Sequence, residues 1–561
     1  MRAAVIGAGI AGLATAALLA RDGYDVEVLE QQHRIGGRAA TWQQDGFTFD
    51  LGPSWYLMPE VFDHFFRLFG TSAEVELDLV RLDPAYRVFF EPAVAGAAPR
   101  VDVRTGAAEQ AFEVLEPGSA PRLREHLESA REAYDLALRR FLYTSFERPT
   151  RLLHPEVLRA APRLAPLLGR SLEGLVARRF RDPRARQVLG YPAVFLGTSP
   201  ERAPALYHLM SHADLDVGVL YPRGGFGAVI DAIVRVAERA GVRIRTGEQV
   251  TAVRTAPDDG ARGARTGRLP GLGSGHRAAR VVGVELADGS LVTADVVVGA
   301  GDLHHLETRL LPDELATYPQ SWWDRRDPGP GAVLVHLGVR GRVPQLAHHS
   351  MFFTRDWRAN FDAVLGASAR VPDPASFYVC TPSRTDPGTA PADHENLFVL
   401  VPVPADPGLG AGGIAGTGDP VVERVADAAI ATISTWAGVP DLAERVVVRR
   451  TVGPGDFARD LHSWRGGALG PAHTLRQSAF LRGRNASAHV AGLLYAGGST
   501  IPGIGLPMCL ISAELVAKRL RGDRSSGPLP EPRPGPARPG RTRPDPARPD
   551  PTPADAAGVH P

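Results

Sequence analysis

Three glycines near the N-terminus have the spacing of a turn that binds phosphate groups. Gly7, Gly9 and Gly12 follow a predicted strand, Arg2–Ile6, and open a predicted helix that runs to Arg21. The first glycine permits a tight turn, the second lets the backbone approach a pyrophosphate, and the third lets the helix pack closely on the strand. The N-terminus of the helix adds free N–H groups and a partial positive charge. The turn therefore predicts a site for a phosphate-bearing cofactor.

An acidic residue lies at the distance that such a turn requires. A second predicted strand, Asp25–Leu29, ends at Glu30. The Glu30 carboxylate can accept hydrogen bonds from ribose hydroxyls, and its charge would repel a 2′-phosphate. Strand, turn, helix and acid together predict a bound dinucleotide. The alternative is a glycine turn with a purely structural role.

The residues after Glu30 indicate which dinucleotide is bound. They include the short motifs Ile35-Gly36-Gly37-Arg38, Phe49-Asp50 and Gly52-Pro53. Here the chain resembles the large flavoprotein group that contains amine oxidases and carotenoid desaturases, whose second glycine pair and arginine sit beside the FAD phosphates. The physical interpretation agrees, because two glycines allow close backbone approach and Arg38 adds a fixed charge. The alternative for Arg38 is a solvated surface arginine.

Further segments resemble one branch of that group, the bacterial phytoene desaturases. They are Tyr221-Pro222-Arg223-Gly224-Gly225-Phe226-Gly227, Gln345-Leu346-Ala347-His348-His349, Gln477-Ser478-Ala479-Phe480, Glu156-Val157-Leu158-Arg159-Ala160-Ala161-Pro162, and the run from Gly497 to Pro507. Together they span about residues 1–522. The chain departs from the family pattern in a longer insertion at 257–280 and in Ile501, where some members carry histidine; the second departure leaves the precise substrate open.

The resemblance implies a reaction and a setting for it. Phytoene desaturases convert single bonds of a long polyene to double bonds, towards lycopene in carotenoid biosynthesis, with FAD taking the electrons. A hydrocarbon substrate offers no polar group, so it is recognised by an apolar channel and is taken from the membrane. We therefore expect a cytoplasmic protein, peripheral to the inner face of the cell membrane, with quinone or oxygen as electron acceptor. The oligomeric state and the number of desaturation steps stay open.

The resemblance and the spacing also assign site residues. Glu156 and Arg159 lie three residues apart, on one helix face, and match an acid/arginine pair proposed as catalytic in the family; a surface ion pair is the alternative. Asp302 is expected at the flavin or its ribitol, or else as a helix N-cap. The residues predicted to bind FAD are Gly7, Gly9, Gly12, Glu30, Gly37, Arg38, Val250, Asp302, Gly498, Leu506, Pro507 and Met508. The last three would line the isoalloxazine ring, with a helix from Cys509 directing its N-terminus at it.

A pair of histidines could suggest a metal. His348 and His349 are expected to be fold determinants or polar pocket residues, because no further His, Asp or Glu spacing completes a metal site. The two cysteines, Cys380 and Cys509, form no CxxC pair, so neither a thiolate zinc site nor a disulfide scaffold is expected. We predict no metal.

The composition limits the classes of function. The chain has 63 basic and 62 acidic residues and a net charge of +1, which argues against nucleic-acid binding. The apolar run after Arg2 contains the glycine turn and is read as strand–turn–helix, not as a signal peptide. Elsewhere no run of about 18 apolar residues is present, so no transmembrane helix is predicted.

With 561 residues, the chain is too long for one ordinary core. We predict an α/β fold: a discontinuous Rossmann-type FAD-binding domain (1–80, 221–305 and 478–522) with an inserted α+β substrate domain (81–220 and 306–477) and a helical, membrane-facing region. A Pro-rich tail, 523–561, is expected to be disordered. Helices are predicted at Arg122–Phe146 and Pro155–Phe180.

Apolar helix faces within Leu152–Phe180 are the candidates for membrane docking; simple core packing is the alternative. The arginines that could meet anionic headgroups are Arg151, Arg159, Arg163, Arg170, Arg178 and Arg179.

Three other functions are compatible with parts of the sequence. Amine oxidases commonly bridge a lysine to the flavin through water, yet the single lysine of this chain, Lys518, sits near the C-terminal end of the last predicted helix. Another carotenoid, such as diapophytoene or a hydroxylated intermediate, could be the substrate. Escort proteins for prenylated GTPases share the architecture without catalysis, and such a protein should be colourless where a flavoprotein is yellow.

Overall fold

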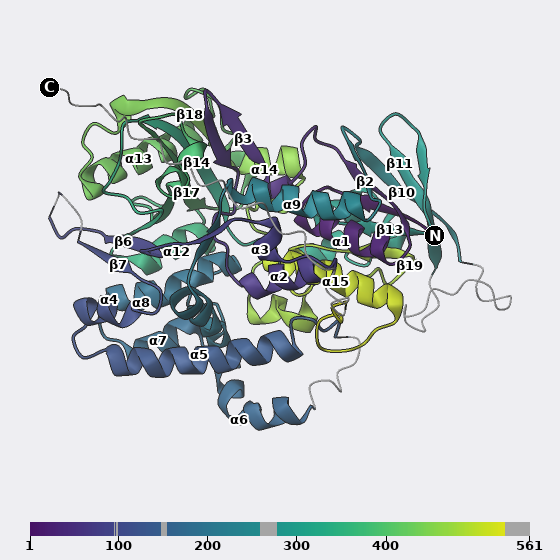
Figure 1. Ribbon diagram of the computed structural model, residues 1–561, viewed down its shortest axis with the longest axis horizontal. Helices are drawn as coiled ribbons and strands as arrows, with labels where there is room; N and C mark the ends of the chain where they lie inside the picture. The colour runs from purple at the N-terminus through teal and green to yellow at the C-terminus, as the bar shows by residue number, and fades with distance from the viewer. Residues whose placement is uncertain (95, 97–98, 147–153, 259–277, 533–561) are drawn as a thin grey trace, which may run out of the picture.

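The structure, a computed structural model, describes residues 1–94, 96, 99–146, 154–258 and 278–532 (Figure 1). A parallel five-stranded sheet has the order β20-β13-β1-β2-β9. Its strands are β1 (Arg2–Ile6), β2 (Asp25–Glu30), β9 (Arg243–Thr246), β13 (Val296–Gly299) and β20 (Leu493–Tyr495). All three chain segments predicted to form one discontinuous unit contribute strands. Parallel strands are covered on both faces, which fits the short, continuous apolar runs of β1 and β13.

Helices cover one face of this sheet. α1 (Ile10–Arg21) packs against α9 (Gly225–Arg239) and α15 (Leu506–Arg521), which lie on either side of it in Figure 1. Every residue of α1 from Ile10 to Leu19 is buried. The small residues of this helix, mostly alanine and glycine, let the two neighbours approach closely.

An antiparallel ribbon covers the other face. It consists of β10 (Val250–Pro257), β11 (Ala279–Leu286) and β12 (Leu291–Thr293), with β19 (Val490–Ala491) paired to β11. Valines of the ribbon share one apolar cluster with Ala4, Leu29 and Val297 of the parallel sheet. Most of the predicted insertion, residues 259–277, lies outside the described residues.

A second, mostly antiparallel sheet has seven strands in the order β18-β14-β17-β16-β15-β6-β7. The strands are β6 (Tyr86–Phe90), β7 (Arg100–Val103), β14 (Gly331–Arg340), β15 (His349–Phe353), β16 (Phe377–Cys380), β17 (His394–Val403) and β18 (Val446–Val452). Helix α13 (Pro420–Ala437) packs on one face through a cluster of valines and isoleucines. The chain is thus a mixed α/β fold, and its two largest sheets are the parallel sheet and the seven-stranded sheet.

A helical layer occupies the lower part of Figure 1: α4 (Ala108–Leu115), α5 (Ala120–Arg140), α6 (Pro155–Leu168), α7 (Leu172–Arg179) and α8 (Pro183–Gly190). The remaining elements are α2 (Pro59–Arg67), α3 (Ala73–Glu76), α10 (Leu303–Arg309), α11 (Gln320–Trp323), α12 (Trp357–Leu365), α14 (Pro454–Leu461), β3 (Thr41–Gln44), β4 (Phe47–Asp50), β5 (Leu79–Arg81) and β8 (Leu220–Pro222). Among the described helices, none combines the length and apolar character needed to cross a bilayer.

Two helix predictions were wrong in their extent. The helix predicted at Arg122–Phe146 ends at Arg140. The helix predicted at Pro155–Phe180 is broken into α6 and α7, because the Ser171 side chain accepts a hydrogen bond from the Gly174 N–H and starts a new helix there. A serine that satisfies a free N–H group is a strong helix N-cap.

The tail boundary at residue 523 was also wrong. Residues 523–532 are ordered against α15, with Leu529 only 2% exposed. The Lys518 ammonium donates hydrogen bonds to the carbonyl oxygens of Tyr143 at 2.9 Å, Ser525 at 2.9 Å and Gly527 at 2.6 Å. The single lysine of the chain therefore fastens this segment; residues 533–561 lie outside the described residues.

Candidate functional site

The glycine turn after β1 leaves its backbone open to a ligand. Gly7 has φ +100°, a conformation that favours glycine. A Cβ on Gly12 would lie 1.9 Å from the Gly7 carbonyl oxygen, so only glycine lets α1 pack here. A Cβ on Gly9 would meet only the Gly36 carbonyl oxygen, at 4.0 Å. The protein does not need glycine at this position for its own packing, which fits close approach of a ligand.

The second motif lies directly beside this turn. The Gly36 N–H donates to the Ala8 carbonyl oxygen at 2.9 Å, and Gly37 has φ +55°. Among the described residues, the buried Nε of Arg38 has no hydrogen-bond partner. A glycine cradle next to a guanidinium nitrogen with spare capacity fits the pyrophosphate of a dinucleotide.

Glu30 lies at the end of β2 and is 7% exposed. Its carboxylate accepts hydrogen bonds from the Ala8 N–H at 2.7 Å and the Gln32 N–H at 2.9 Å. Each oxygen keeps a lone pair, so the carboxylate fixes the loop and can still accept a ribose hydroxyl. Val250, at the start of β10, belongs to the apolar cluster that contains Leu29, next to Glu30.

A third loop completes the arrangement. Gly497 has φ +117°, and a Cβ there would lie 3.7 Å from the Cβ of Ala11 in α1. Gly498 follows it. Asp302 is the N-cap of α10, as the alternative prediction held, and it also accepts from the Trp464 N–H at 3.3 Å. Burial raises the pKa of Asp302, while the charge of Arg38 lowers it.

The structure thus gathers eight of the predicted FAD residues at the carboxyl ends of the parallel strands, where ligands bind in open α/β sheets. They are Gly7, Gly9, Gly12, Glu30, Gly37, Arg38, Asp302 and Gly498. Three features fit FAD. The space at Gly9 that a side chain would fill and the unpartnered guanidinium nitrogen of Arg38 fit its phosphates. The lone pairs left on the Glu30 carboxylate fit its ribose.

The last helix begins earlier than predicted. α15 starts at Leu506, not at Cys509, because Gly505 at φ +117° turns the chain and Pro507 is accommodated in the first turn, where its missing N–H costs nothing. Leu506, Pro507 and Met508 are therefore the first helical residues. Leu506 and Met508 pack against the same apolar cluster as Trp55, a cluster that includes residues of α1.

Glu156 and Arg159 do not join this site. The Glu156 carboxylate pairs with Arg139 at 2.9 Å and Arg140 at 2.7 Å on α5, and not with Arg159, which is exposed. These ion pairs lower the pKa of Glu156. In Figure 1, α6 lies at the lower edge of the molecule, apart from α1. Their catalytic role stays a prediction, and the geometry favours the surface ion-pair alternative, with the arginines of α5 as partners.

A functional residue that the sequence did not reveal is Arg482. Its buried guanidinium donates to the carbonyl oxygens of Pro471 at 2.9 Å, Thr500 at 3.2 Å and also Gly498. Burial lowers its pKa to about 10. Arg482 therefore holds the Gly497–Pro507 loop in place. Its position soon after the Gln477–Phe480 segment was the available signal, but the chain has many arginines.

The buried ring of His349 and the ring of Trp55 lie beside the short helix η3 (Tyr191–Leu196). The His349 ring stacks on Trp55 at 4.4 Å, and Trp55 contacts Phe195 of η3 at 5.5 Å. Gly197, just after η3, lies against Ile504 of the third loop. Trp55, which stacks on His349, and the Gly497–Pro507 loop therefore both lie against η3 or the residue that follows it.

The histidines have an unexpected neighbour. Ligand atoms of His348, His349 and Cys380 lie within 4.8 Å of one another, because β15 pairs with β16 and places His349 opposite Cys380. Sequence spacing did not reveal this third potential ligand, because Cys380 reaches the two histidines only through strand pairing. Burial raises the pKa of Cys380 to about 12 and lowers that of His348 to about 3, so the cluster is uncharged. The absence of a metal stays a prediction.

Asp50 of the Phe49-Asp50 motif predicts a pH effect. Its buried carboxylate accepts from the Phe226 and Gly227 N–H groups at the start of α9. Burial outweighs these bonds and raises its pKa to about 7. Since the folded-state pKa lies above the unfolded value of about 4, the contribution of Asp50 to stability is full below about pH 4 and is lost as the pH rises through about 7.

We expect the free energy of unfolding to fall between pH 4 and 7 by up to about 4 kcal/mol through this group. Asp50→Asn should flatten that slope, whereas Asp362→Asn, which removes an exposed carboxylate, should not. Urea unfolding at several pH values measures both. Identical slopes in all three proteins would contradict the assignment.

Comparison with protein families and relatives supports these features. The family model for flavin containing amine oxidoreductase matches residues 10–521. The chain is 39% identical over 521 residues to a carotenoid 3,4-desaturase of Haloarcula japonica, covering 92% of this chain and 98% of that protein. It is 36% identical to a zeta-carotene-forming phytoene desaturase of Myxococcus xanthus (92% and 93%), and 28% identical to a 4,4′-diapophytoene desaturase of Staphylococcus haemolyticus (94% and 100%).

Solved structures share the fold. An oxidoreductase from Methanosarcina mazei superimposes with a TM-score of 0.55 at 16% identity, over 91% of this chain and 99% of that one. A putrescine oxidase bound to putrescine gives 0.54 at 15% identity, over 94% and 98%. At this level of identity the likeness concerns the fold alone.

Proposed function

The chain belongs to the flavin containing amine oxidoreductase family, and within it we propose that this protein desaturates a carotenoid, with phytoene as substrate and lycopene as product. The observation that carries the proposal is the near full-length match to carotenoid desaturases at 36–39% identity, together with the glycine cradle at the sheet edge. The activity is an FAD-dependent oxidation of CH–CH groups. We further propose that residues 1–80, 221–305 and 478–522 form the FAD domain, with quinone or oxygen as electron acceptor.

The residues of the chain divide the work as follows. Gly7, Gly9 and Arg38 would hold the phosphates, and the N-terminus of α15 would contribute partial positive charge to the flavin. The chemistry that FAD would supply there is the acceptance of a hydride from the polyene. Burial lowers the pKa of His348 and of His349, so both rings are neutral and poor proton acceptors, which supports a role in shaping the pocket or the fold.

Two other functions fit the observations to different degrees. Desaturation of another carotenoid is favoured by the relative named carotenoid 3,4-desaturase, at 39% identity. An amine oxidase that uses its lysine at the flavin fits poorly, since the Lys518 ammonium is occupied by three backbone carbonyls.

The test is expression in bacterial cells that accumulate phytoene, and in matched cells that accumulate lycopene, followed by pigment chromatography. Lycopene in the first cells is the expected result. Unchanged phytoene with a new, more desaturated pigment in the second cells would move the substrate to a later carotenoid. No new pigment in either, from a folded yellow protein, would contradict carotenoid desaturation.

We also propose that α6 docks on the inner face of the cell membrane, from which the substrate is taken. Of the residues of α6, all of them described, only Leu167 is buried. Leu158 is 52% exposed. Exposed arginines Arg159, Arg163, Arg170 and Arg178 accompany it; Arg151 lies outside the described residues. An apolar face beside arginines is typical of helices that lie in a membrane interface.

Leu158→Asp should weaken binding to vesicles containing anionic lipid by at least about tenfold, because a leucine side chain contributes about 1.5–3 kcal/mol when it is buried. Leu291→Asp is the matched control, since Leu291 on β12 is also 52% exposed. Vesicle sedimentation measures both. Equal binding of the two variants would contradict docking through α6.

A further inference from the structure

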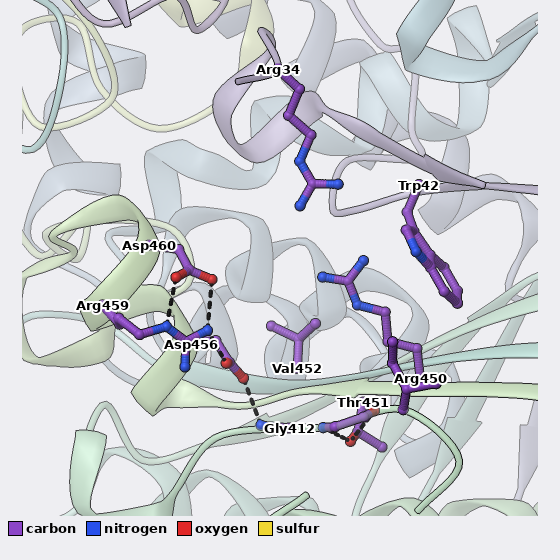
Figure 2. A pocket seen from close by; sticks show the side chains of 11 residues that line it. Arg34, Trp42, Gly412, Arg450, Thr451, Val452, Asp456, Arg459 and Asp460 are labelled. Carbon is purple, nitrogen blue, oxygen red and sulfur yellow. Dashed lines mark hydrogen bonds and ion pairs between the residues drawn. The ribbon is translucent and has the colours of Figure 1, made fainter. Parts of the chain in front are cut away.

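A cavity of about 360 Å³ lies between the segment that precedes the Gly36-Gly37-Arg38 motif and the edge of the seven-stranded sheet (Figure 2). One wall comes from the segment after β2 and from β3, which supply Arg34 and Trp42. The opposite wall comes from β18 and α14, with Arg450 and Arg459. A loop at Gly412–Ile414 closes one side. The cavity therefore joins the nucleotide-binding part of the chain to the seven-stranded sheet.

The acidic groups in this cavity are already used. Arg459 pairs with Asp456 at 2.7 Å and with Asp460 at 2.7 Å. The second oxygen of Asp456 accepts from the Gly412 N–H at 2.6 Å and the Gly453 N–H at 2.8 Å. Arg459 and its two carboxylates thus form a set that is satisfied internally.

The two other arginines of the cavity make no close ion pair. Within the described part of the chain, Arg34 and Arg450 have no acidic partner in hydrogen-bond or ion-pair contact. Figure 2 shows both guanidinium groups extending into the same open space, towards each other. The pKa of Arg450 is lowered by its burial and then by the charge of Arg34, while the charges of Asp456 and Asp460 raise it in part. Two cations that face each other across a cavity repel, and an anion between them would reverse the sign of that interaction.

The cavity walls also indicate the kind of anion. Trp42 presents no free face for a base or a flavin ring, because Phe49 stacks on it at 5.4 Å and the Arg450 guanidinium lies over it at 4.9 Å. Recognition must therefore rest on charge and hydrogen bonding. Converging guanidinium groups suit the oxygens of a phosphate, which they can bind in a forked geometry.

We propose that this cavity binds a soluble phosphate anion, inorganic phosphate or a small phosphate ester, between Arg34 and Arg450. A lipid headgroup is a poor candidate, since β3, β18 and α14 lie in the upper part of Figure 1 and α6 lies at the lower edge. The bound anion would tie the two parts of the chain together. The proposal is independent of the substrate.

The test uses the flavin-loaded protein and inorganic phosphate, with ionic strength held constant by chloride. Calorimetry should give saturable binding, and phosphate should raise the unfolding temperature. Arg34→Gln and Arg450→Gln should each weaken binding at least tenfold, about 1.4 kcal/mol, with flavin content unchanged. Arg424→Gln, which removes an exposed arginine on α13, should bind phosphate like the wild type.

Arg450→Gln also removes the contact of the guanidinium with the Trp42 ring, so circular dichroism first checks that this variant folds. If Arg450→Gln does not fold, the comparison of Arg34→Gln with the wild type tests the proposal, because Arg34 is exposed and its replacement should not affect folding. Equal phosphate binding by all four proteins would overturn the proposal. Loss of flavin from the Arg34 and Arg450 variants would also overturn it, since the arginines would then belong to the cofactor site. Binding of anionic vesicles but not of phosphate would contradict the proposal that the ligand is a soluble anion.

Discussion

Replacing Gly9 by valine should give a folded protein without flavin. A Cβ at Gly9 meets only the Gly36 carbonyl oxygen at 4.0 Å, and the residue has φ −75°, so the valine is tolerated by the protein itself. The new methyl groups occupy the space that the pyrophosphate needs. We expect flavin affinity to fall by at least about 100-fold, or ~2.7 kcal/mol, which leaves the purified protein colourless.

The measurement is the ratio of flavin to protein absorbance after purification, with circular dichroism as the check on folding. Gly169→Val is the matched control, since Gly169 also has negative φ and its Cβ would meet only the Pro166 carbonyl oxygen at 3.9 Å. A Gly9→Val protein with full flavin content would contradict the nucleotide assignment. Glu30→Ala should also lose flavin, but it additionally releases the Ala8 and Gln32 N–H groups.

Replacing Arg482 by methionine should have the second large effect, on stability. Methionine fills the volume but leaves the buried carbonyl oxygens of Pro471, Gly498 and Thr500 without their donor. Each unsatisfied buried acceptor costs about 1–3 kcal/mol. After partial relaxation we expect the free energy of unfolding to fall by about 3–5 kcal/mol.

Because the freed carbonyls belong partly to the Gly497–Pro507 loop, flavin retention should decline together with stability. Denaturant unfolding and flavin content should be measured on the same preparations. Arg484→Met provides the control, since Arg484 is exposed two residues later. An Arg482→Met protein as stable as this control would show that the loop does not depend on the guanidinium.

The local parts of the nucleotide site could be predicted from the sequence. Gly7, Gly9 and Gly12 between a strand and a helix, and Glu30 at the end of the next strand, form a unit whose geometry depends on contacts within thirty residues. Here backbone preference and apolar periodicity agree, so the strand β1 and the end of β2 lie where predicted. Helix ends were less certain, because they depend on single capping groups such as Ser171 and Gly505.

Contacts between residues that are far apart in the sequence could not be predicted in this way. Arg482 acquires its role only when four backbone carbonyls, those of Pro471, Gln477, Gly498 and Thr500, surround it. Cys380 meets His349 only through strand pairing. Glu156 pairs with Arg139 and Arg140 on α5 and not with Arg159 on its own helix, because side-chain pairing depends on which helices pack together. The sequence by itself determined that a dinucleotide turn exists and which residues form it. Only the tertiary structure decided which buried polar groups support it and where unpaired charge collects, because those contacts are long-range and are selected by the packing of the whole chain.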